Sequence, residues 1–109
     1  SYPMNISEAN LNCIKSLREK FKCNVGYSGH ESLGYLICTT AVVLGATSIE
    51  RHISIDRSMY GSDQPASLEE KGLARLVRDI RLIDTILGDG TKKIWPSEIP
   101  VMKKLRADN

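Results

Sequence analysis

The alternation of helical and strand patterns restricts the fold of this chain more than any other feature of its sequence. The apolar spacing predicts helices at residues 7–22, 32–44 and 67–87, with strands at 24–29 and 48–53 between them. Strands joined by helices run parallel, because right-handed crossovers return the chain to the same edge of the sheet. We therefore predict an α/β fold whose strands end at one edge, where such folds place their ligand sites.

Capping residues mark the predicted helix ends. Ser7 is expected to cap the first helix, with Glu8 favourable in its first turn. Gly45 is suited to the C-terminal cap of the second helix. The third helix is expected to open at Ser67, which forms a capping box with Glu70. Its apolar stripe comprises Leu73, Leu76, Val77, Ile80, Ile83 and Leu87.

Both histidines of the chain fall at strand ends. Side chains alternate along a strand, so Ser28 and His30 share one face of the first strand, and Glu50 and His52 share the same face of the second. Because parallel neighbours end at one edge, we expect the two imidazoles to lie close together. Two histidines suit an open site in which substrate and water complete the shell. We therefore predict that His30 and His52 hold a divalent metal.

Other roles remain open for these polar residues. Either histidine alone is more typical of a hydrogen-bonded residue than of a ligand, and only their shared face and edge bring the two interpretations level. Glu50 either orients a ligand or forms an ion pair inside the sheet, and the ion pair is the commoner arrangement. Asp63 lies in the long 54–66 loop and, taken alone, is a turn aspartate. Ser28 is placed to donate to a phosphate or carboxylate.

Composition and charge exclude several classes of function. The chain has 109 residues, enough for one small domain, and a net charge of +2. Its late basic cluster lacks interleaved aromatic residues, so we expect a solvated tail and no nucleic-acid partner. No apolar run approaches the ~20 residues of a membrane span, and the start does not resemble a signal peptide. We expect a cytoplasmic protein with reduced thiols, in which Cys13 and Cys38 are buried in helices.

Five ordered motifs make the chain resemble the sialic acid synthase family. They are Val-Gly-Tyr-Ser-Gly-His at 25–30, Leu-Gly-Ala at 44–46, Ile-Glu-Arg-His-Ile at 49–53, Gly-Ser-Asp-Gln-Pro-Ala-Ser-Leu-Glu at 61–69 and Leu-Gly-Asp-Gly at 87–90. The match extends over nearly the whole chain. Members condense phosphoenolpyruvate with an N-acylmannosamine-type sugar aldehyde to form nonulosonic acids such as N-acetylneuraminate.

The resemblance implies a fold and a set of site residues. The family fold is a (β/α)₈ barrel, and this chain matches the end of strand six through helix eight, a partial TIM barrel. His30 and His52 match the two manganese ligands, while Tyr2 and Ser28 match positions that contact phosphoenolpyruvate. Asp63 matches an aspartate near the metal-bound water and the sugar aldehyde. Residues 1–90 would then form the barrel portion, and residues 91–109 a tail or linker.

The chain also departs from the family pattern. Gly29 stands where many members have aspartate, and Tyr-Gly-Ser-Asp at 60–63 replaces the common Pro-Gly-Pro-Asp, which leaves the acceptor sugar open. The first five strands and the antifreeze-like domain are expected to be absent. We expect a homo-oligomer, or a barrel completed by another polypeptide, with weak or absent manganese binding by the isolated chain. The alternatives are a non-catalytic split-subunit module and an unrelated TIM-barrel enzyme such as a heptulosonate synthase.

Overall fold

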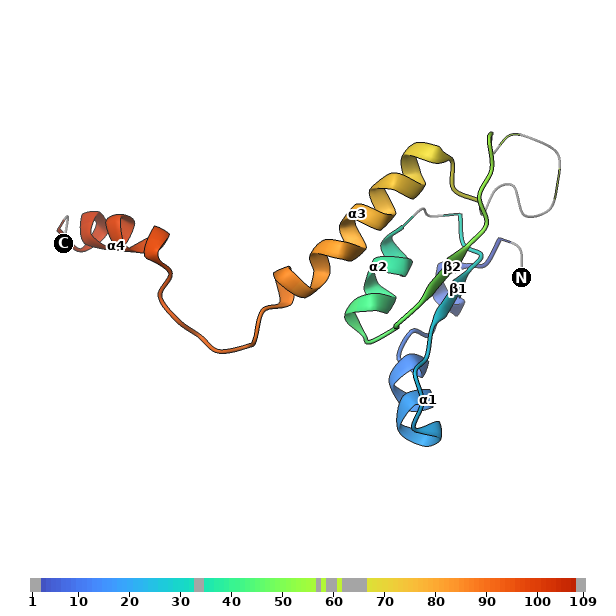
Figure 1. Cartoon of the computed structure of the whole chain (residues 1–109), viewed down its shortest axis with the longest axis horizontal. Helices are drawn as coiled ribbons and strands as arrows, with labels where there is room; N and C mark the ends of the chain where they lie inside the picture. The colour runs from blue at the N-terminus through green and yellow to red at the C-terminus, as the bar shows by residue number, and fades with distance from the viewer. Residues whose placement is uncertain (1–2, 33–34, 57, 59–60, 62–66, 108–109) are drawn as a thin grey trace.

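The computed structural model describes residues 3–32, 35–56, 58, 61 and 67–107 (Figure 1). The predicted alternation of helices and parallel strands is confirmed. In chain order the elements are a 3₁₀ turn η1 (Ile6–Glu8), helix α1 (Cys13–Phe21), strand β1 (Tyr27–Gly29), helix α2 (Leu36–Val43), strand β2 (Ile49–Arg51), helix α3 (Glu70–Leu87), a 3₁₀ turn η3 (Pro96–Glu98) and helix α4 (Ile99–Ala107).

Strands β1 and β2 pair in parallel, with Ser28 opposite Glu50. Two short segments extend this pair at its carboxyl end. The backbone at Met4 bridges to Glu31 beside β1, and the backbone at Ile53 bridges to Leu68 beyond β2. Both bridges are parallel, so the described strand segments all run in one direction, as βα alternation requires.

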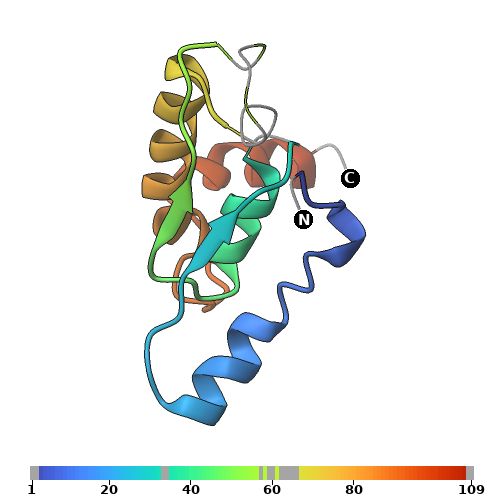
Figure 2. The same cartoon turned by 90° about the vertical axis from the view of Figure 1, so that its right-hand side faces the viewer.

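The helices cover one face of the strand pair. Figure 2 shows β1 and β2 in front of α2 and α3, with α1 below them. Val25, Tyr27 and Ile49 are the strand residues that pack against this layer, as their predicted alternation requires. The buried residues they contact come from α1, α2 and α3 and the segments beside them: Ile14, Cys38, Ala41, Ala46, Leu68 and Leu76.

Three predicted details were wrong. Asn5 rather than Ser7 caps the first turn, which is the short 3₁₀ turn η1, and α1 begins only at Cys13. Helix α3 begins at Glu70 rather than after Ser67, because Leu68 continues as extended backbone and pairs with Ile53. Cys13 is exposed, whereas Cys38 is buried as predicted, and all three thiols are free.

The molecule is extended for its size. Its radius of gyration is 19.1 Å, whereas a compact domain of this length has a value of about 13 Å. Its accessible surface is 8419 Å², against about 6,000 Å² for a compact monomer of this mass. Part of the excess comes from an arm that carries η3 and α4 away from the body and has no buried residue (Figure 1). No described helix is both long and apolar enough to cross a membrane.

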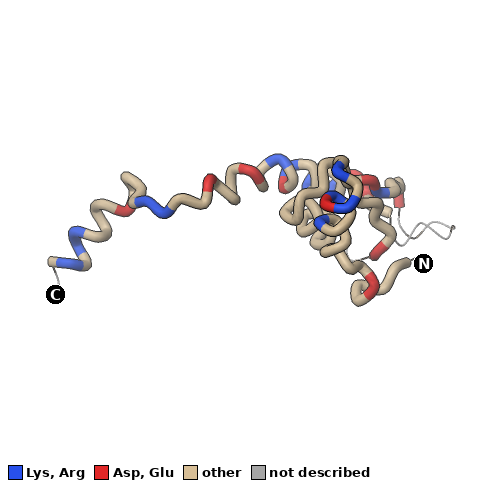
Figure 3. Tube along the Cα trace, turned by 90° about the horizontal axis from the view of Figure 1, so that it is seen from below, with Lys and Arg blue, Asp and Glu red and all other residues tan. Residues whose placement is uncertain are grey.

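Charged residues of both signs occur along the described part of the chain. In Figure 3, Lys and Arg are interspersed with Asp and Glu over the body and α3, and the basic residues of α4 lie at the far end of the arm.

Candidate functional site

His30 and His52 lie side by side at the carboxyl edge of the strand pair. Their ring centroids are 5.4 Å apart and the ring planes meet at 53°. Two imidazole nitrogens that share one metal at ~2.1 Å hold their ring centres roughly 5 Å apart. The structure therefore brings together the two histidines that the sequence paired, at a spacing close to that of a shared metal.

The backbone of each histidine is held by a neighbouring segment. The amide of Met4 donates to the carbonyl oxygen of His30 at 2.9 Å, and the amide of Leu68 donates to the carbonyl oxygen of His52 at 2.8 Å. Ser54 donates its own amide to Leu68 at 2.8 Å, so the extended pairing continues past the second histidine. These bonds fix the backbone positions from which both imidazoles project.

Ser28 and Glu50 form a second polar pair on the same face. The Ser28 hydroxyl donates to Oε1 of Glu50 at 2.8 Å, and both residues are exposed. Glu50 therefore contacts a substrate-binding candidate, rather than forming the internal ion pair that its position favoured. A serine held by a carboxylate keeps its oxygen lone pairs accessible, and its proton can turn toward a bound anion.

A buried charged cluster, which the sequence interpretation missed, lies on the opposite face. The Glu31 side chain is 0% exposed and forms an ion pair with Arg51, whose side chain is 3% exposed. Nη2 of Arg51 also donates to the Glu31 carbonyl oxygen at 2.9 Å. The Tyr27 hydroxyl donates to Oε2 of Glu31 at 2.7 Å, and Sγ of Cys38 lies 3.9 Å from Oε1. One carboxylate thus joins β1, β2 and α2.

The cluster keeps its neutral members protonated. Burial, then the hydrogen bond to Glu31, raises the pKa of Tyr27 well above its usual range, so the phenol remains a donor. Burial also raises the pKa of the Cys38 thiol. Both effects leave the Glu31 carboxylate and the Arg51 guanidinium as the charged partners of the cluster.

Gly29 makes room for the Arg51 side chain. A Cβ atom at this position would lie 2.7 Å from Cδ and 2.8 Å from Nη1 of Arg51, closer than side chains pack. A larger residue at position 29 would therefore require the Arg51 side chain to shift from its path to Glu31.

The described residues supply some, but not all, of the ligands that a divalent metal needs. Within the described ranges, no group of three or more His, Cys, Asp or Glu side chains is arranged to hold an ion. The histidine pair therefore supplies two nitrogen ligands and leaves the remaining positions to other groups, as in an open catalytic site. The predicted site residues Tyr2 and Asp63 lie outside the described residues.

Comparisons with known proteins define the class to which this fold and site belong. The model of the NeuB family matches residues 1–92. The chain therefore belongs to the NeuB family, the sialic acid synthases, and the sequence resemblance is confirmed.

Particular relatives carry synthase names. The chain is 44% identical over 106 residues to the N-acetylneuraminate-9-phosphate synthase of Mus musculus, covering 96% of this chain and 29% of that protein. It is 39% identical over 106 residues to the N,N'-diacetyllegionaminic acid synthase of Legionella pneumophila, covering 97% of this chain and 30% of that protein. The chain thus spans less than a third of the length of these relatives.

Solved structures agree with the fold. The N-acetylneuraminic acid (sialic acid) synthetase of Leptospira borgpetersenii, in complex with citrate, superimposes with a TM-score of 0.76 at 40% identity, covering 95% of this chain and 36% of that one. The spore coat polysaccharide biosynthesis protein spsE of Bacillus subtilis also gives 0.76, at 32% identity, covering 88% and 27%. Both likenesses extend over most of the present chain.

Proposed function

We propose that this chain is the C-terminal part of a (β/α)₈ barrel, from the end of strand six through helix eight. The whole barrel would condense phosphoenolpyruvate with an N-acylmannosamine-type sugar aldehyde to form a nonulosonic acid. The observation that carries the proposal is the 5.4 Å spacing of the His30 and His52 rings at the carboxyl edge of parallel strands. Enzymes with this fold place their active sites at that edge.

In this proposal each site residue has a stated role. His30 and His52 hold manganese or another divalent metal, Ser28 and Tyr2 contact phosphoenolpyruvate, and Asp63 lies beside the aldehyde. When bound, the metal supplies Lewis-acid polarisation of the aldehyde oxygen. The enol carbon attacks the carbonyl, water adds to the resulting oxocarbenium-like centre, and phosphate leaves.

The structure supplies a starting state for Ser28 in this scheme. Its hydroxyl donates to Glu50 at 2.8 Å. Because phosphate and carboxylate groups are acceptors, the hydroxyl must turn from Glu50 to donate to phosphoenolpyruvate.

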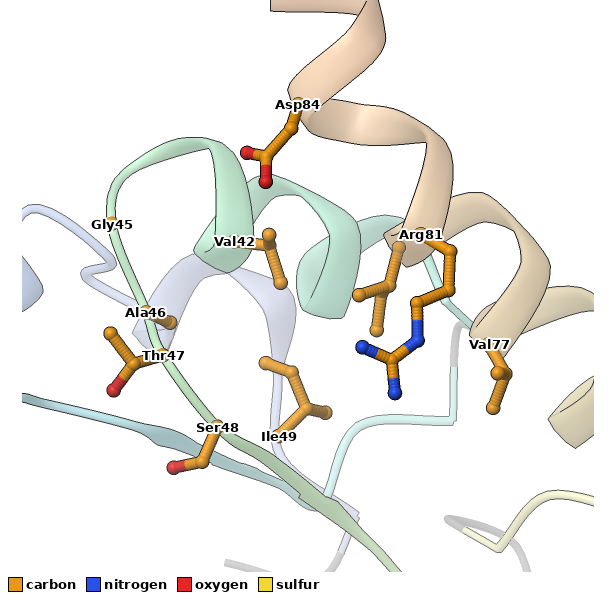
Figure 4. Close-up of a pocket in the computed structure, with 10 residues that line it drawn as sticks. Val42, Gly45, Ala46, Thr47, Ser48, Ile49, Val77, Arg81 and Asp84 are labelled. Carbon is orange, nitrogen blue, oxygen red and sulfur yellow. The ribbon is translucent and has the colours of Figure 1, made fainter.

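Exposed apolar surface supports an incomplete barrel. Ile53 is 66% exposed and Ile55 is 92% exposed at the end of the second strand segment. A groove between α2, β2 and α3 leaves Val42, Ile49 and Val77 lining an open surface, with Arg81 and Asp84 projecting from α3 (Figure 4). Apolar surface of this kind needs cover, and neighbouring barrel strands and helices provide it. Residues 1–90 are the proposed barrel portion and residues 91–109 the tail.

Reconstitution tests this function. The chain would be mixed with a polypeptide that carries the remaining barrel strands of the Leptospira borgpetersenii N-acetylneuraminic acid synthetase, in manganese buffer with phosphoenolpyruvate and N-acetylmannosamine. We expect phosphate release from the mixture and none when His30→Ala and His52→Ala are combined. Equal phosphate release with the double variant would refute the metal-ligand roles. We expect this reaction to take place in the cytoplasm.

A second candidate is a non-catalytic module that folds by self-association. The accessible surface of 8419 Å² favours it, because the excess of about 2,400 Å² over a compact monomer is more than the roughly 800 Å² per partner that a stable interface buries. Sedimentation velocity distinguishes the candidates. A dimer or larger species that does not dissociate when the missing barrel strands are added supports the module, whereas a 1:1 complex with those strands supports the split barrel.

A further inference from the structure

The two buried charged residues, Glu31 and Arg51, are sequence neighbours of the two histidines. Glu31 follows His30 directly, and Arg51 precedes His52 directly. Because side chains alternate, each charge points to the helix-covered face while its neighbouring imidazole points to the open face. The ion pair therefore links the two backbones that carry the imidazoles.

We propose that the Glu31–Arg51 ion pair is a positioning device that sets the spacing of the His30 and His52 rings. The inference rests on the proposed metal-ligand role of the histidines and extends it to residues that touch neither metal nor substrate. The guanidinium bonds both the carboxylate and the backbone carbonyl of Glu31, so it constrains the strand end itself as well as its side chain.

Three further contacts constrain the Glu31–Arg51 ion pair. The Tyr27 hydroxyl donates to the second carboxylate oxygen of Glu31 at 2.7 Å, which fixes the rotation of the carboxylate. Cys38 approaches both partners, with Sγ 3.9 Å from Glu31 and 3.8 Å from Nη1 of Arg51, and ties them to α2. Gly29 lets the guanidinium cross the strand. The Glu31 and Arg51 side chains are buried on the face away from the site.

A salt bridge is otherwise a poor choice for this position. Apolar residues of similar volume stabilise a buried site as well as an ion pair does, or better, since the two charges lose their hydration. An apolar pair cannot supply directional hydrogen bonds. The Arg51 guanidinium forms them with the Glu31 carboxylate and with its backbone carbonyl oxygen, and so holds the two backbones in one register. The sequence therefore retains a stability-neutral feature whose geometric effect falls on the histidines.

The decisive variant replaces both charges by apolar residues, Glu31→Leu with Arg51→Met, so that neither charge is left buried alone. Two measurements on the 109-residue chain test this variant. The first is the set of nuclear Overhauser effects between the two imidazole rings, which needs no metal. The second is the broadening of the His30 and His52 ring resonances by manganese at millimolar concentrations, which measures weak binding.

A positioning role predicts that the double variant stays folded but loses the inter-ring effects, and that its manganese affinity falls by about tenfold, the lower end of the range for residues that support metal ligands. The control Ile83→Val, at a buried α3 residue outside the Glu31–Arg51 cluster, should change neither readout. If the double variant does not fold, Tyr27→Phe replaces it and should weaken the inter-ring effects in the same direction.

Inter-ring effects retained in the folded variant, with an affinity loss below about fivefold, would overturn the positioning role. The metal proposal fails differently. In that case the wild-type chain keeps its inter-ring effects, but the barrel reconstituted with the missing strands shows no manganese broadening at either ring. The two proposals therefore cannot be mistaken for one another.

Discussion

The β1–β2 pair presents two faces that differ in how their polar groups are packed. On the helix-covered face, Glu31 and Arg51 are buried and joined to Tyr27 and Cys38. On the open face, Ser28, Glu50 and His52 are exposed. Burial of charge on the covered side is matched by hydrogen bonds, whereas the open side holds ligand-type residues that face solvent.

The two faces therefore differ in role. The covered face supports the strand ends, and the open face carries the candidate ligands. A buried carboxylate with three kinds of partner cannot bind a substrate, but it can define where the strand ends lie. The imidazoles at the strand ends, of which His52 is exposed and His30 partly buried, depend for their position on the backbone that carries them. The predictions below alter the open face, the covered face, the glycine between them and, last, the arm outside both.

The largest effect is expected on the open face. In the reconstituted barrel, His30→Ala should lower phosphate release by about 10³-fold or more, because it removes a ligand of a metal that contributes several kcal/mol to transition-state stabilisation. Steady-state assays of phosphate release measure the loss. Lys71→Ala, an exposed α3 residue, is the control and should leave the rate unchanged. Comparable rates for both variants would argue against a metal site.

Removal of one charge on the covered face should have the next largest effect. Glu31→Gln leaves the Arg51 cation buried without its counter-charge, so the free energy of unfolding should fall by about 3–5 kcal/mol. Urea titration followed by circular dichroism measures this change. The matched control is Asp79→Asn, which breaks the exposed Arg78–Asp79 pair and should cost no more than about 1 kcal/mol. Similar losses in the two variants would show that the loss of Glu31 does not leave the Arg51 charge buried and uncompensated.

A smaller effect is expected at the glycine between the faces. Gly29→Ala places a methyl group 2.7 Å from Cδ of Arg51, so the guanidinium must shift, at a cost of about 1–3 kcal/mol. Gly72→Ala is the matched control, since its Cβ meets only Leu68 at 3.7 Å and alanine favours the α3 helix by about 1 kcal/mol. Thermal unfolding of the two variants should therefore shift in opposite directions. A stabilised Gly29→Ala variant would contradict the described path of Arg51.

The smallest effect is expected in the arm. Neither η3 nor α4 buries a residue. Removal of residues 91–109 should change the free energy of unfolding of the body by less than about 0.5 kcal/mol. Denaturant titration of the truncated chain tests this, with the inter-ring contact of His30 and His52 as a second probe. A loss of several kcal/mol would mean that the arm packs on the body.

The sequence predicted the features that depend on local periodicity. The order of helices and strands follows from apolar spacing, and the shared face of His30 and His52 follows from strand alternation, so both were correct. The family motifs then supplied the barrel context. Tyr2 and Asp63 stay predictions, because they lie outside the described residues.

The buried cluster depends on information that no local pattern contains. An ion pair across two strands requires the register that sets Gly29 opposite Arg51, and that register is a tertiary property. One signal was nevertheless present. Glu31 and Arg51 share the alternation of Tyr27 and Ile49, which places two opposite charges on the apolar side of both strands. The late start of α1 was missed because Asn10 adopts a left-handed backbone conformation, with φ of 43°, between η1 and α1.

Phosphate release by the isolated chain tests the central claim most directly, namely that this chain carries one wall of a synthase site and not the whole site. The assay supplies phosphoenolpyruvate, manganese and N-acetylmannosamine to the 109-residue chain alone. We predict no release above that of the combined His30→Ala and His52→Ala variant. Catalytic turnover that depends on both histidines in the isolated chain would contradict the account.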